Sequence, residues 1–441
     1  MKKSSFQINL PWWKVLQNSR ALAHNPIPFH RQWFQTYGNT LGIKFINGAR
    51  VMLTRDPEVI MHVLRKNHRN YHKSDVTTYG LGEYIGYGLL TLNGQEWKKD
   101  RRLLQPGFYK KRIEHLYNTT IPKTVQKKLD EIPLDTTIDI KPYMNELAFE
   151  VVTNALFDIQ IEAKVLSEIR IIIDEIQLFF VKEVRQPQWN LVRKLSGQKK
   201  QALALVARIR ELMNGFIEAR IASDSPHNDL LDLMLQSRYE DGSPMERHRI
   251  IDELIILIVA GHETTANALS FMIHYLAKNP EIVDQLHREI QPLEASDLSP
   301  YEQLSQIKYG QAVVQETLRK CPPAWIVDRK ALTDDSIGDL HIPKNALIGL
   351  SIYELHHNPE FWEEPELFKP ERFLSSPPPV YIPFGSGPRM CIGNHFALFE
   401  MVEILRQMVL RFRWETPQEQ LEETALITLQ PTSVKVYMTH A

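Results

Sequence analysis

The sequence predicts a mainly α-helical protein with small β-sheets, in the α+β class. Long segments with apolar residues three and four apart dominate the middle of the chain, and the strand-like runs are short. Helices and strands do not alternate as they do in βαβ units. With 441 residues, of which 43% are apolar and 24% charged, the chain is long enough to build one large hydrophobic core.

The first elements are marked by turn and cap residues. IKFI and RVML flank Asn47–Gly48, which predicts a hairpin over residues 41–54 with a type I′ turn. Asp56 followed by Pro57 predicts an N-cap and the first turn of a helix. Apolar spacing then predicts helices over residues 168–184 and 201–221.

The longest predicted helix begins at Ser243, where Ser243 and Glu246 form a capping box around Pro244. Its pattern continues to about Ala277, a length of roughly 50 Å. The centre, LIILIVAGHETTANALS, is apolar on nearly every side, so we expect this helix to be buried.

Later elements follow from similar signals. A second capping box, Ser299 with Glu302, predicts a helix that ends at Lys320 before two prolines. The segment SSPPP at Ser375–Pro379 predicts a loop, and the runs ALITL and VKVYM predict two strands near the end.

Charge and cysteine content limit the function. Lys+Arg 52 against Asp+Glu 53 gives a net charge of −1, which does not indicate a nucleic-acid partner. Two cysteines exclude a disulfide framework and favour a reducing compartment. The N-terminal residues lack the continuous apolar core of a signal peptide or membrane span, and we expect Trp12 and Trp13 to pack on the body of the fold. These observations predict a cytoplasmic protein.

Cys391 stands in the loop FGSGPRMCIG, just before an apolar helix. A zinc site would need more ligands, and only His395 is near. A nucleophilic thiol would need a positioned histidine base, and a buried structural cysteine is also compatible with the sequence.

The neighbours of Cys391 favour a further interpretation. The glycines let the backbone turn tightly and approach a flat partner, the arginine can bind an anionic group, and the aromatic ring can keep the sulfur dry. Amides at the start of the following helix can donate to a thiolate. A thiolate tuned in this way suits a haem iron. The neighbours concerned are Gly385, Gly387, Gly393, Arg389 and Phe384.

The loop resembles the haem-binding loop of the cytochrome P-450 superfamily, the haem-thiolate monooxygenases, of soluble bacterial type. AGHETT (260–265), ETLR (316–319), PERF (370–373) and WKKDR (97–101) resemble further motifs of that family, in the same order along the chain. The resemblance implies the P-450 fold, with a long central helix over a haem. It also implies that residues 1–441 form a single haem domain without a fused reductase, because only 441 − 391 = 50 residues follow Cys391.

By this resemblance, haem b is the cofactor and Cys391 is the axial ligand of its iron. The haem propionates would be bound by Trp97, Arg101, Arg329 and Arg389, and Phe384 and Gly393 would complete the cysteine loop. Many relatives have a histidine at the position of Asp100. We therefore expect the propionate contact in this segment to come from Arg101 and not from its neighbour.

The AGHETT segment would form the oxygen side of the haem. A zinc-protease HExxH motif is excluded because residue 266 is alanine. The resemblance assigns Ala260 and Gly261 to the space for dioxygen, and Glu263 and Thr264 to proton delivery as the catalytic pair. An ordinary buried helix, with its threonine bonded to its own backbone, is the alternative.

Glu316, Arg319 and Arg372 would form a buried structural triad that braces the cysteine loop. Cys321, which follows ETLR and lacks a glycine loop, is expected to be an incidental buried thiol.

The predicted activity is insertion of one oxygen atom from O2 into a substrate C–H bond. A peroxygenase, or a haem-thiolate sensor or carrier without turnover, would not need the Glu263–Thr264 pair. Electrons would come from a soluble ferredoxin or flavodoxin with its reductase. A basic cluster would steer that partner, and a solvated helix face is the alternative explanation of that cluster. The cluster consists of Lys98, Lys99, Arg101, Arg102, Lys110, Lys111 and Arg112.

The substrate is predicted to be small and polar, with oxidative O-demethylation of a methylated sugar and release of formaldehyde as the reaction. Hydroxylation of a fatty acid, a terpenoid or another apolar substrate is the alternative. The prediction depends on polar residues near the expected pocket, which Glu183 and Arg185 would help to line. The candidate substrate residues are Tyr79, Tyr84, Tyr87, Leu257, Trp325, Val327 and Asp328.

Overall fold

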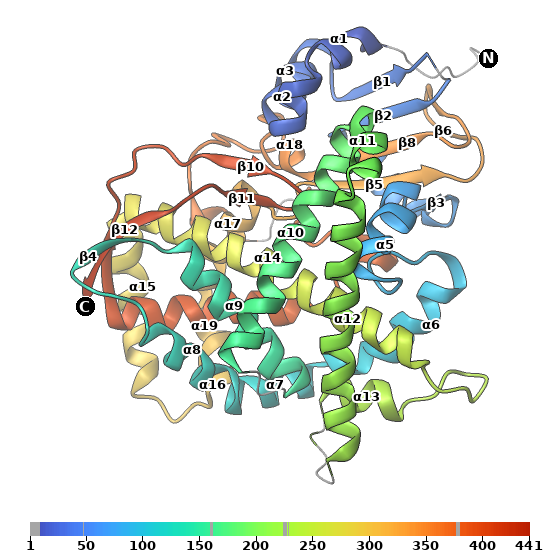
Figure 1. Cartoon of the computed structure of the whole chain (residues 1–441). Helices are drawn as coiled ribbons and strands as arrows, with labels where there is room; N and C mark the ends of the chain where they lie inside the picture. The colour runs from blue at the N-terminus through green and yellow to red at the C-terminus, as the bar shows by residue number, and fades with distance from the viewer. Residues whose placement is uncertain (1–8, 47, 159–161, 224–226, 228, 376–379) are drawn as a thin grey trace.

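The computed structural model describes residues 9–441 except 47, 159–161, 224–226, 228 and 376–379. Helices form most of the molecule, and the small sheets lie at its edges (Figure 1). The mainly α prediction with small sheets is confirmed. The α-helices are α1 Trp12–Gln17, α2 Ser19–His24, α3 Ile27–Tyr37, α4 Pro57–Met61, α5 Gly82–Ile85, α6 Gly94–Leu104, α7 Lys110–Thr119, α8 Ile121–Leu129, α9 Lys141–Phe157, α10 Ala163–Arg185, α11 Asn190–Leu195, α12 Gln198–Ala222, α13 Leu230–Gln236, α14 Arg247–Lys278, α15 Pro280–Glu294, α16 Pro300–Gln306, α17 Lys308–Lys320, α18 Ile352–His356 and α19 Asn394–Arg411.

Shorter helical turns connect these elements. Two have the wider π geometry, η1 His62–Lys66 and η3 Val76–Leu81. The 3₁₀ turns are η2 His68–Asn70, η4 Gln105–Phe108, η5 Pro187–Trp189, η6 Pro370–Phe373 and η7 Gly387–Arg389.

The largest sheet has the strand order β1-β2-β8-β5-β3. The predicted hairpin is confirmed, with Leu41 opposite Leu53, although Asn47 of its predicted turn lies outside the described residues. β5 runs antiparallel to β8 and places Arg329 opposite Ile348. The strands of the described chain are β1 Thr40–Lys44, β2 Arg50–Thr54, β3 Tyr71–His72, β4 Thr136–Asp139, β5 Ile326–Ala331, β6 Asp335–Ile337, β7 Leu340–Ile342, β8 Leu347–Ser351, β9 Phe412–Glu415, β10 Glu423–Ala425, β11 Leu429–Pro431 and β12 Lys435–His440.

α14 is the central helix, and α10 and α12 lie over it in the view of Figure 1. Its 32 residues correspond to about 48 Å, and most of them are buried, as predicted. The predicted start was wrong: the helix begins at Arg247, and the Ser243 hydroxyl bonds to Asp241 within a preceding turn. The Ser243 amide donates to the same carboxylate at 2.9 Å, so the predicted cap residue stabilises the turn instead of the helix.

Among the described helices, α14 alone is long and apolar enough to cross a membrane by length and composition. Residues on every side of it are buried inside the protein, which is the environment of a core helix.

Two other boundaries differ from prediction. The capping box of Ser299 and Glu302 is present, but the helix it begins ends at Gln306, and α17 starts after a break at Ile307. The ALITL run is the turn between β10 and β11 and not one strand, because Leu426 and Thr428 bond across it. VKVYM forms most of β12, as predicted, and residues 376–379 of the predicted SSPPP loop lie outside the described residues.

The N-terminal helices cover the large sheet. Trp12 packs beside Leu10, Trp33 and Phe34, whereas the Trp13 side chain is 50% exposed. The expected packing on the body of the fold therefore holds for one tryptophan of the pair.

Candidate active site

The cysteine loop is held by its own backbone hydrogen bonds. The Cys391 amide donates to the Phe384 carbonyl at 3.0 Å, and the Gly385 amide donates to the Ile382 carbonyl at 3.0 Å. Gly387 has a φ of +72°, and a Cβ there would lie 2.0 Å from the Leu64 carbonyl oxygen. Glycine is required at this position because the loop lies directly on η1.

The Cys391 side chain keeps accessible surface, yet burial of the thiol group raises its pKa. The Gly393 amide and the charge of Arg101 oppose this rise, which favours the thiolate. Gly393 is also the N-cap of α19, so the predicted helix-start donor is present.

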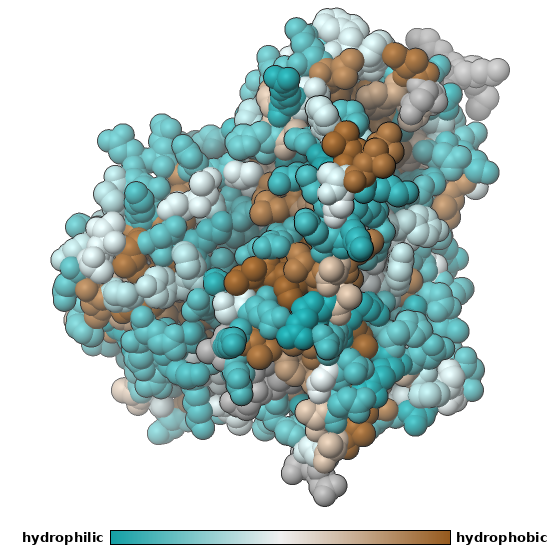
Figure 2. Space-filling model, viewed as in Figure 1, coloured by the Kyte–Doolittle hydropathy of each residue, from teal (hydrophilic) through white to brown (hydrophobic). Residues whose placement is uncertain are grey.

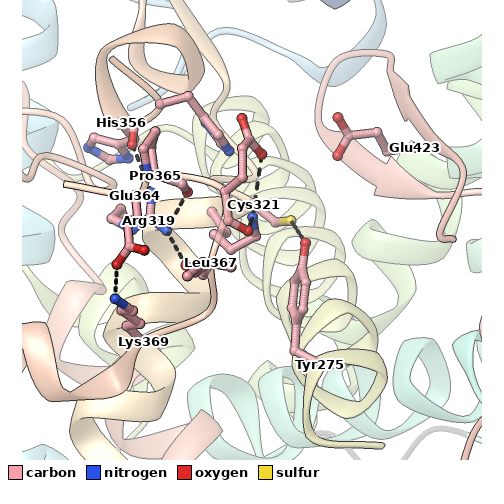
Figure 3. A network of polar contacts seen from close by, with 12 residues as sticks. Tyr275, Arg319, Cys321, His356, Glu364, Pro365, Leu367, Lys369 and Glu423 are labelled. Carbon is pink, nitrogen blue, oxygen red and sulfur yellow. Dashed lines mark hydrogen bonds and ion pairs between the residues drawn. The ribbon is translucent and has the colours of Figure 1, made fainter. Parts of the chain in front are cut away.

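Cys321 lies in a different environment from Cys391, inside the hydrophobic core. It is 1% exposed, lies in a cluster with Phe271 and Trp325, and contacts the Tyr275 hydroxyl at 3.6 Å, as Figure 3 shows. Burial raises its pKa far above the ordinary thiol value. It is the inert core thiol that the sequence predicted.

α14 opens at one point along its buried length. Residues 250–259 are buried, but Ala260 is exposed, and the Thr264 hydroxyl donates to the Ala260 carbonyl at 2.7 Å. Gly261 does not share this opening, because a Cβ there would lie 3.0 Å from Val152 of α9. Its absent side chain therefore permits close packing of α14 on α9.

The side chains of Glu263 and Thr264 have different partners. Glu263 accepts hydrogen bonds from Gln177 of α10 at 2.8 Å and from Thr428 at 2.7 Å. Burial raises its pKa, and these two donors oppose the rise. The predicted catalytic pair is adjacent in sequence but is not joined by a hydrogen bond.

Arg389 is the centre of a cluster of cations. Its guanidinium lies 4.1 Å from the centre of the Trp97 ring and donates to the Leu92 carbonyl at 2.6 Å. Nη1 of Arg389 is buried and has no partner among the described residues. Burial and the charges of Arg329 and Arg101 lower the pKa of Arg389 to about 9.

Two further cations face Arg389. Arg329 is 5% exposed and donates to the Asp328 carbonyl at 2.6 Å. Lys73 was not predicted as a site residue; burial lowers its pKa to about 7, helped by the charges of Arg329 and Arg389 and opposed by that of Asp328. No sequence motif marks Lys73, because the pairing of β3 with β5 brings it to Arg329.

Arg101 lies on the cysteine side of this cluster. It donates to Gln105 at 2.9 Å and to the Met390 carbonyl at 3.1 Å, so α6 is tied directly to the cysteine loop.

These residues fit an iron porphyrin that carries two carboxylates. An accessible thiol, an exposed alanine on α14 and an excess of cations with a buried, unpartnered guanidinium nitrogen match its iron, its flat ring and its propionates. No group of three or more His, Cys, Asp or Glu in the described ranges is placed to hold a metal ion by itself.

Glu316, Arg319 and Arg372 meet behind the cysteine loop. Arg319 forms two hydrogen bonds to Glu316, at 2.7 and 2.8 Å, and Arg372 approaches Glu316 at 3.5 Å. The Arg319 guanidinium also donates to carbonyls of His356, Pro365 and Leu367, as Figure 3 shows. Glu316 and Arg319 are both fully buried.

The polar residues predicted to bind substrate are largely engaged within the protein. The fully buried Tyr84 donates its hydroxyl to Glu183, which also pairs with Lys199 at 3.7 Å. Asp328 accepts from the hydroxyls of Ser74 and Thr77. Its carboxylate therefore ties β5 to Ser74 and to the start of η3.

The remaining predicted wall residues divide into two groups. Tyr79 and Tyr87 are 65% and 40% exposed, and Val327 is half-buried. Leu257 and Trp325 are buried, and the Trp325 ring nitrogen donates to the Leu426 carbonyl at 3.2 Å. Arg185 donates to carbonyls of Ala23, His24, Ala425 and Leu426, so it joins α10 to the N-terminal helices.

Comparison with known proteins agrees with this geometry. The family model described as "Cytochrome P450" matches residues 6–438. The chain belongs to the cytochrome P450 family. It is a cytochrome P450 monooxygenase that binds haem b, uses O2 and takes electrons from a redox partner to oxidise an organic substrate.

Relatives of this cytochrome P450 come from bacteria and animals. It is 27% identical over 425 residues to cyclooctat-9-en-7-ol 5-monooxygenase of Streptomyces melanosporofaciens, which covers 93% of this chain and 92% of that protein. It is 29% identical to putative cytochrome P450 132 of Mycobacterium tuberculosis, over 87% of this chain and 86% of that protein. It is also 29% identical to cytochrome P450 3A56 of Fundulus heteroclitus, over 86% of this chain and 81% of that protein.

The fold is that of a solved P450 heme domain. The crystal structure of the cytochrome P450DA heme domain aligns with a TM-score of 0.83 at 22% identity, over 94% of this chain and 93% of that chain.

Proposed function

We propose that this cytochrome P450 hydroxylates an apolar substrate of the terpenoid or fatty-acid type. The observation that carries the proposal is that Tyr84 and Asp328, expected to bind a sugar, already have partners in the protein. A buried polar group that is satisfied internally gains little by exchanging its partner for a ligand hydroxyl. The predicted O-demethylation of a methylated sugar thus becomes the second candidate.

Other features support an apolar substrate. Leu257, Trp325 and Val327 contribute hydrocarbon or aromatic surface to the predicted wall. Figure 2 shows apolar side chains over α11, where Leu191 and Leu195 are 68% and 79% exposed beside the cover formed by α10 and α12. The Streptomyces relative is named for oxidation of cyclooctat-9-en-7-ol.

When bound, haem b would supply the reductive activation of O2 for insertion of one oxygen atom into the substrate C–H bond, with the other leaving as water. Cys391 would hold the cofactor, and Lys73, Arg329 and Arg389 would bind its carboxylates. Thr264 presents a hydroxyl in the opening of α14 and can pass protons there. Transfer from Glu263 to Thr264 requires the Glu263 carboxyl to leave Gln177 and Thr428.

A spectral titration tests the substrate class. We expect fatty acids and terpenoid alcohols, but not methoxy sugars, to shift the purified ferric protein from low to high spin. Tyr84→Phe should leave the dissociation constant of the effective compound within about threefold, because its hydroxyl already serves Glu183. Tyr79→Phe, which removes an exposed hydroxyl, is the matched control. A shift with a methoxy sugar alone, weakened about tenfold or more in Tyr84→Phe, would establish the sugar candidate.

We also propose that the redox partner is a soluble ferredoxin or flavodoxin that docks on the basic cluster. Lys98, Lys99, Lys110 and Lys111 are exposed on α6 and α7, and α6 is tied to the cysteine loop through Arg101. Arg102 and Arg112 are less available, because Arg102 pairs with Glu240 and Arg112 is half-buried near Asp229 and Asp232. The predicted single domain and cytoplasmic location remain predictions compatible with such a partner.

The docking proposal predicts a salt-dependent rate. Replacing Lys98 and Lys99 together by glutamate should slow reduction by a ferredoxin about tenfold at low ionic strength and less at high salt. Lys344→Glu, at an exposed lysine near β7, is the control. A reduction rate that neither salt nor the double variant changes would exclude this docking face.

A further inference from the structure

His356 is the last residue of α18, and it contacts two parts of the proposed haem site. The residue is 0% exposed. Its carbonyl accepts a hydrogen bond from Arg319 at 2.9 Å, and Figure 3 shows the two residues side by side. Its ring Nε2 accepts a hydrogen bond from the Ile382 amide at 3.0 Å. His356 therefore joins the Glu316–Arg319–Arg372 cluster to the segment that leads into the cysteine loop.

Further hydrogen bonds continue from Ile382 to Cys391. The Ile382 carbonyl accepts from the Gly385 amide at 3.0 Å, and the Phe384 carbonyl accepts from the Cys391 amide at 3.0 Å. Ile382 is 7% exposed and lies in the same apolar cluster as Leu355. The imidazole of His356 is thus the first acceptor in a series of hydrogen bonds that fixes the backbone between Ile382 and Cys391.

Neighbouring aromatic rings fix the orientation of the imidazole. The centre of the Tyr381 ring lies 5.6 Å from that of His356, with the two planes 24° apart, and the Trp362 ring meets His356 edge-on at 6.0 Å. The Tyr381 hydroxyl donates to the Gln315 carbonyl of α17 at 3.1 Å, so this ring is itself held in place. A phenylalanine in place of His356 would keep a ring in this position but would not accept a hydrogen bond.

The hydrogen bond to Ile382 defines the protonation state of His356. A backbone amide can only donate, so Nε2 carries the lone pair and Nδ1 carries the single proton of a neutral imidazole. Burial and the charge of Arg319 lower the pKa of His356 to about 3, and backbone groups of Arg319 and Val380 oppose the fall. The ring is therefore a neutral acceptor at the pH at which the enzyme works.

The next residue, His357, is also buried but holds a different part of the chain. It is 7% exposed, its ring Nδ1 donates to the Tyr353 carbonyl at 2.8 Å, and its ring stacks on that of Tyr353 at 4.2 Å. Both contacts are made to α18 itself. The pair of histidines therefore allows a buried ring hydrogen bond to the cysteine loop to be compared with one inside a helix.

We propose that His356 is a positioning residue of the haem site: its neutral imidazole holds Ile382 and so keeps the cysteine loop in the conformation that presents Cys391 as a thiolate. The Gly393 amide and the charge of Arg101 favour that thiolate only while the loop keeps this geometry. The inference rests on the proposed function in one respect, the assignment of Cys391 as the ligand of the haem iron.

The carbon monoxide complex of the ferrous holoenzyme tests the proposal. Its main absorption band lies at a longer wavelength when the sulfur ligand is a thiolate than when the sulfur is protonated or displaced. We measure the rate at which this long-wavelength band decays in mild urea. In His356→Phe the rate should rise about tenfold, because the buried Ile382 amide loses its acceptor. His356→Gln should stay within about threefold of the native rate, because its side-chain oxygen can accept the same hydrogen bond.

His357→Phe is the matched control, because it removes a buried ring hydrogen bond that does not involve Ile382. We expect similar losses of the free energy of unfolding in the two phenylalanine variants, but faster decay of the long-wavelength band in His356→Phe alone. Equal decay rates in these two variants, or a His356→Gln that decays as fast as His356→Phe, would overturn the proposal. A native protein without the long-wavelength band, or a band that persists in Cys391→Ser, would instead refute the assignment of Cys391.

Hydrogen exchange in the native holoenzyme tests the same proposal without a substitution. If the hydrogen bonds from His356 to Cys391 form one unit, the amides of Ile382, Gly385 and Cys391 open together and have similar protection factors. An Ile382 amide whose protection factor is at least about tenfold below that of the Cys391 amide would show that the loop is held without His356, and would overturn the proposal.

Discussion

Two buried clusters of charge lie near the cysteine loop, and they differ in how their charges are compensated. In the Glu316–Arg319–Arg372 cluster, the Arg319 guanidinium is satisfied by a carboxylate and three carbonyls of the same chain. In the Lys73–Arg329–Arg389 cluster, cations face one another and the nearby Asp328 carboxylate is bound by Ser74 and Thr77.

The difference separates a structural cluster from a ligand site. Charges that are paired inside the chain hold segments together and need nothing from outside. Burial, and then mutual repulsion, lower the pKa of Lys73 and Arg389, and cations held in this way gain stability when an external anion binds. We propose that the propionates of haem b are that anion in this cytochrome P450.

The largest expected effect breaks the compensated cluster. Glu316→Ala should lower the free energy of unfolding by about 3–5 kcal/mol, because it leaves Arg319 buried without its carboxylate. Urea denaturation of the holoenzyme measures this loss. Glu364→Ala, which removes an exposed pair with Lys369, should change the free energy of unfolding far less. An equal decrease in the free energy of unfolding in the two variants would mean that the Glu316 cluster does not stabilise the fold.

A second variant tests the cation cluster. Arg389→Met should speed haem release about tenfold, because it removes a charge-assisted contact to a propionate. Release is measured as transfer of haem to an excess of a scavenging protein. In the haem-free chain the substitution removes the contacts of Arg389 with Trp97 and the Leu92 carbonyl but also the repulsion from Arg329 and Arg101, so we expect stability to change less than haem release does. Arg102→Met, at the exposed pair with Glu240, is the control. Unchanged release with a less stable haem-free chain would make Arg389 structural instead.

The smallest expected effect is the pH dependence contributed by Lys73. Its pKa is about 7 in the folded chain without haem, against an ordinary 10.5. A neighbouring propionate would favour the charged ammonium form of Lys73. Above pH 7, haem binding would therefore be accompanied by protonation of Lys73, and haem affinity would fall as the pH rises. Haem release should therefore be faster at pH 9 than at pH 7, and Lys73→Met should reduce this difference. An identical pH dependence in both proteins would show that Lys73 does not bind the propionate.

Much of the site was predictable because short motifs encode local chemistry. The cysteine loop needs glycine at Gly387 and a helix start at Gly393, and both requirements are visible in FGSGPRMCIG. The Glu316–Arg319 pair is likewise local, since residues three apart share a helix face.

The sequence could not show where a distant element changes a residue's surroundings. Gly261 was assigned to the oxygen space, but Val152 of α9 lies against it. Tyr84 was assigned to a substrate, but Glu183 of α10 accepts its hydroxyl hydrogen bond. Ser243 was assigned to a helix cap, but its hydroxyl donates a hydrogen bond to Asp241 in the preceding turn instead.

The sequence by itself determined the helix-rich class and the cytochrome P450 family, and it singled out Cys391 as the residue proposed to hold the iron. Periodicity, glycine placement and motif order are properties of the sequence itself, so they can be recognised before the fold is known. Only the tertiary structure decided which charges are compensated, which polar groups remain free, and that Lys73 joins Arg329 and Arg389. Compensation depends on every charge within a few ångströms in a buried environment, and residues far apart in the chain supply most of those charges.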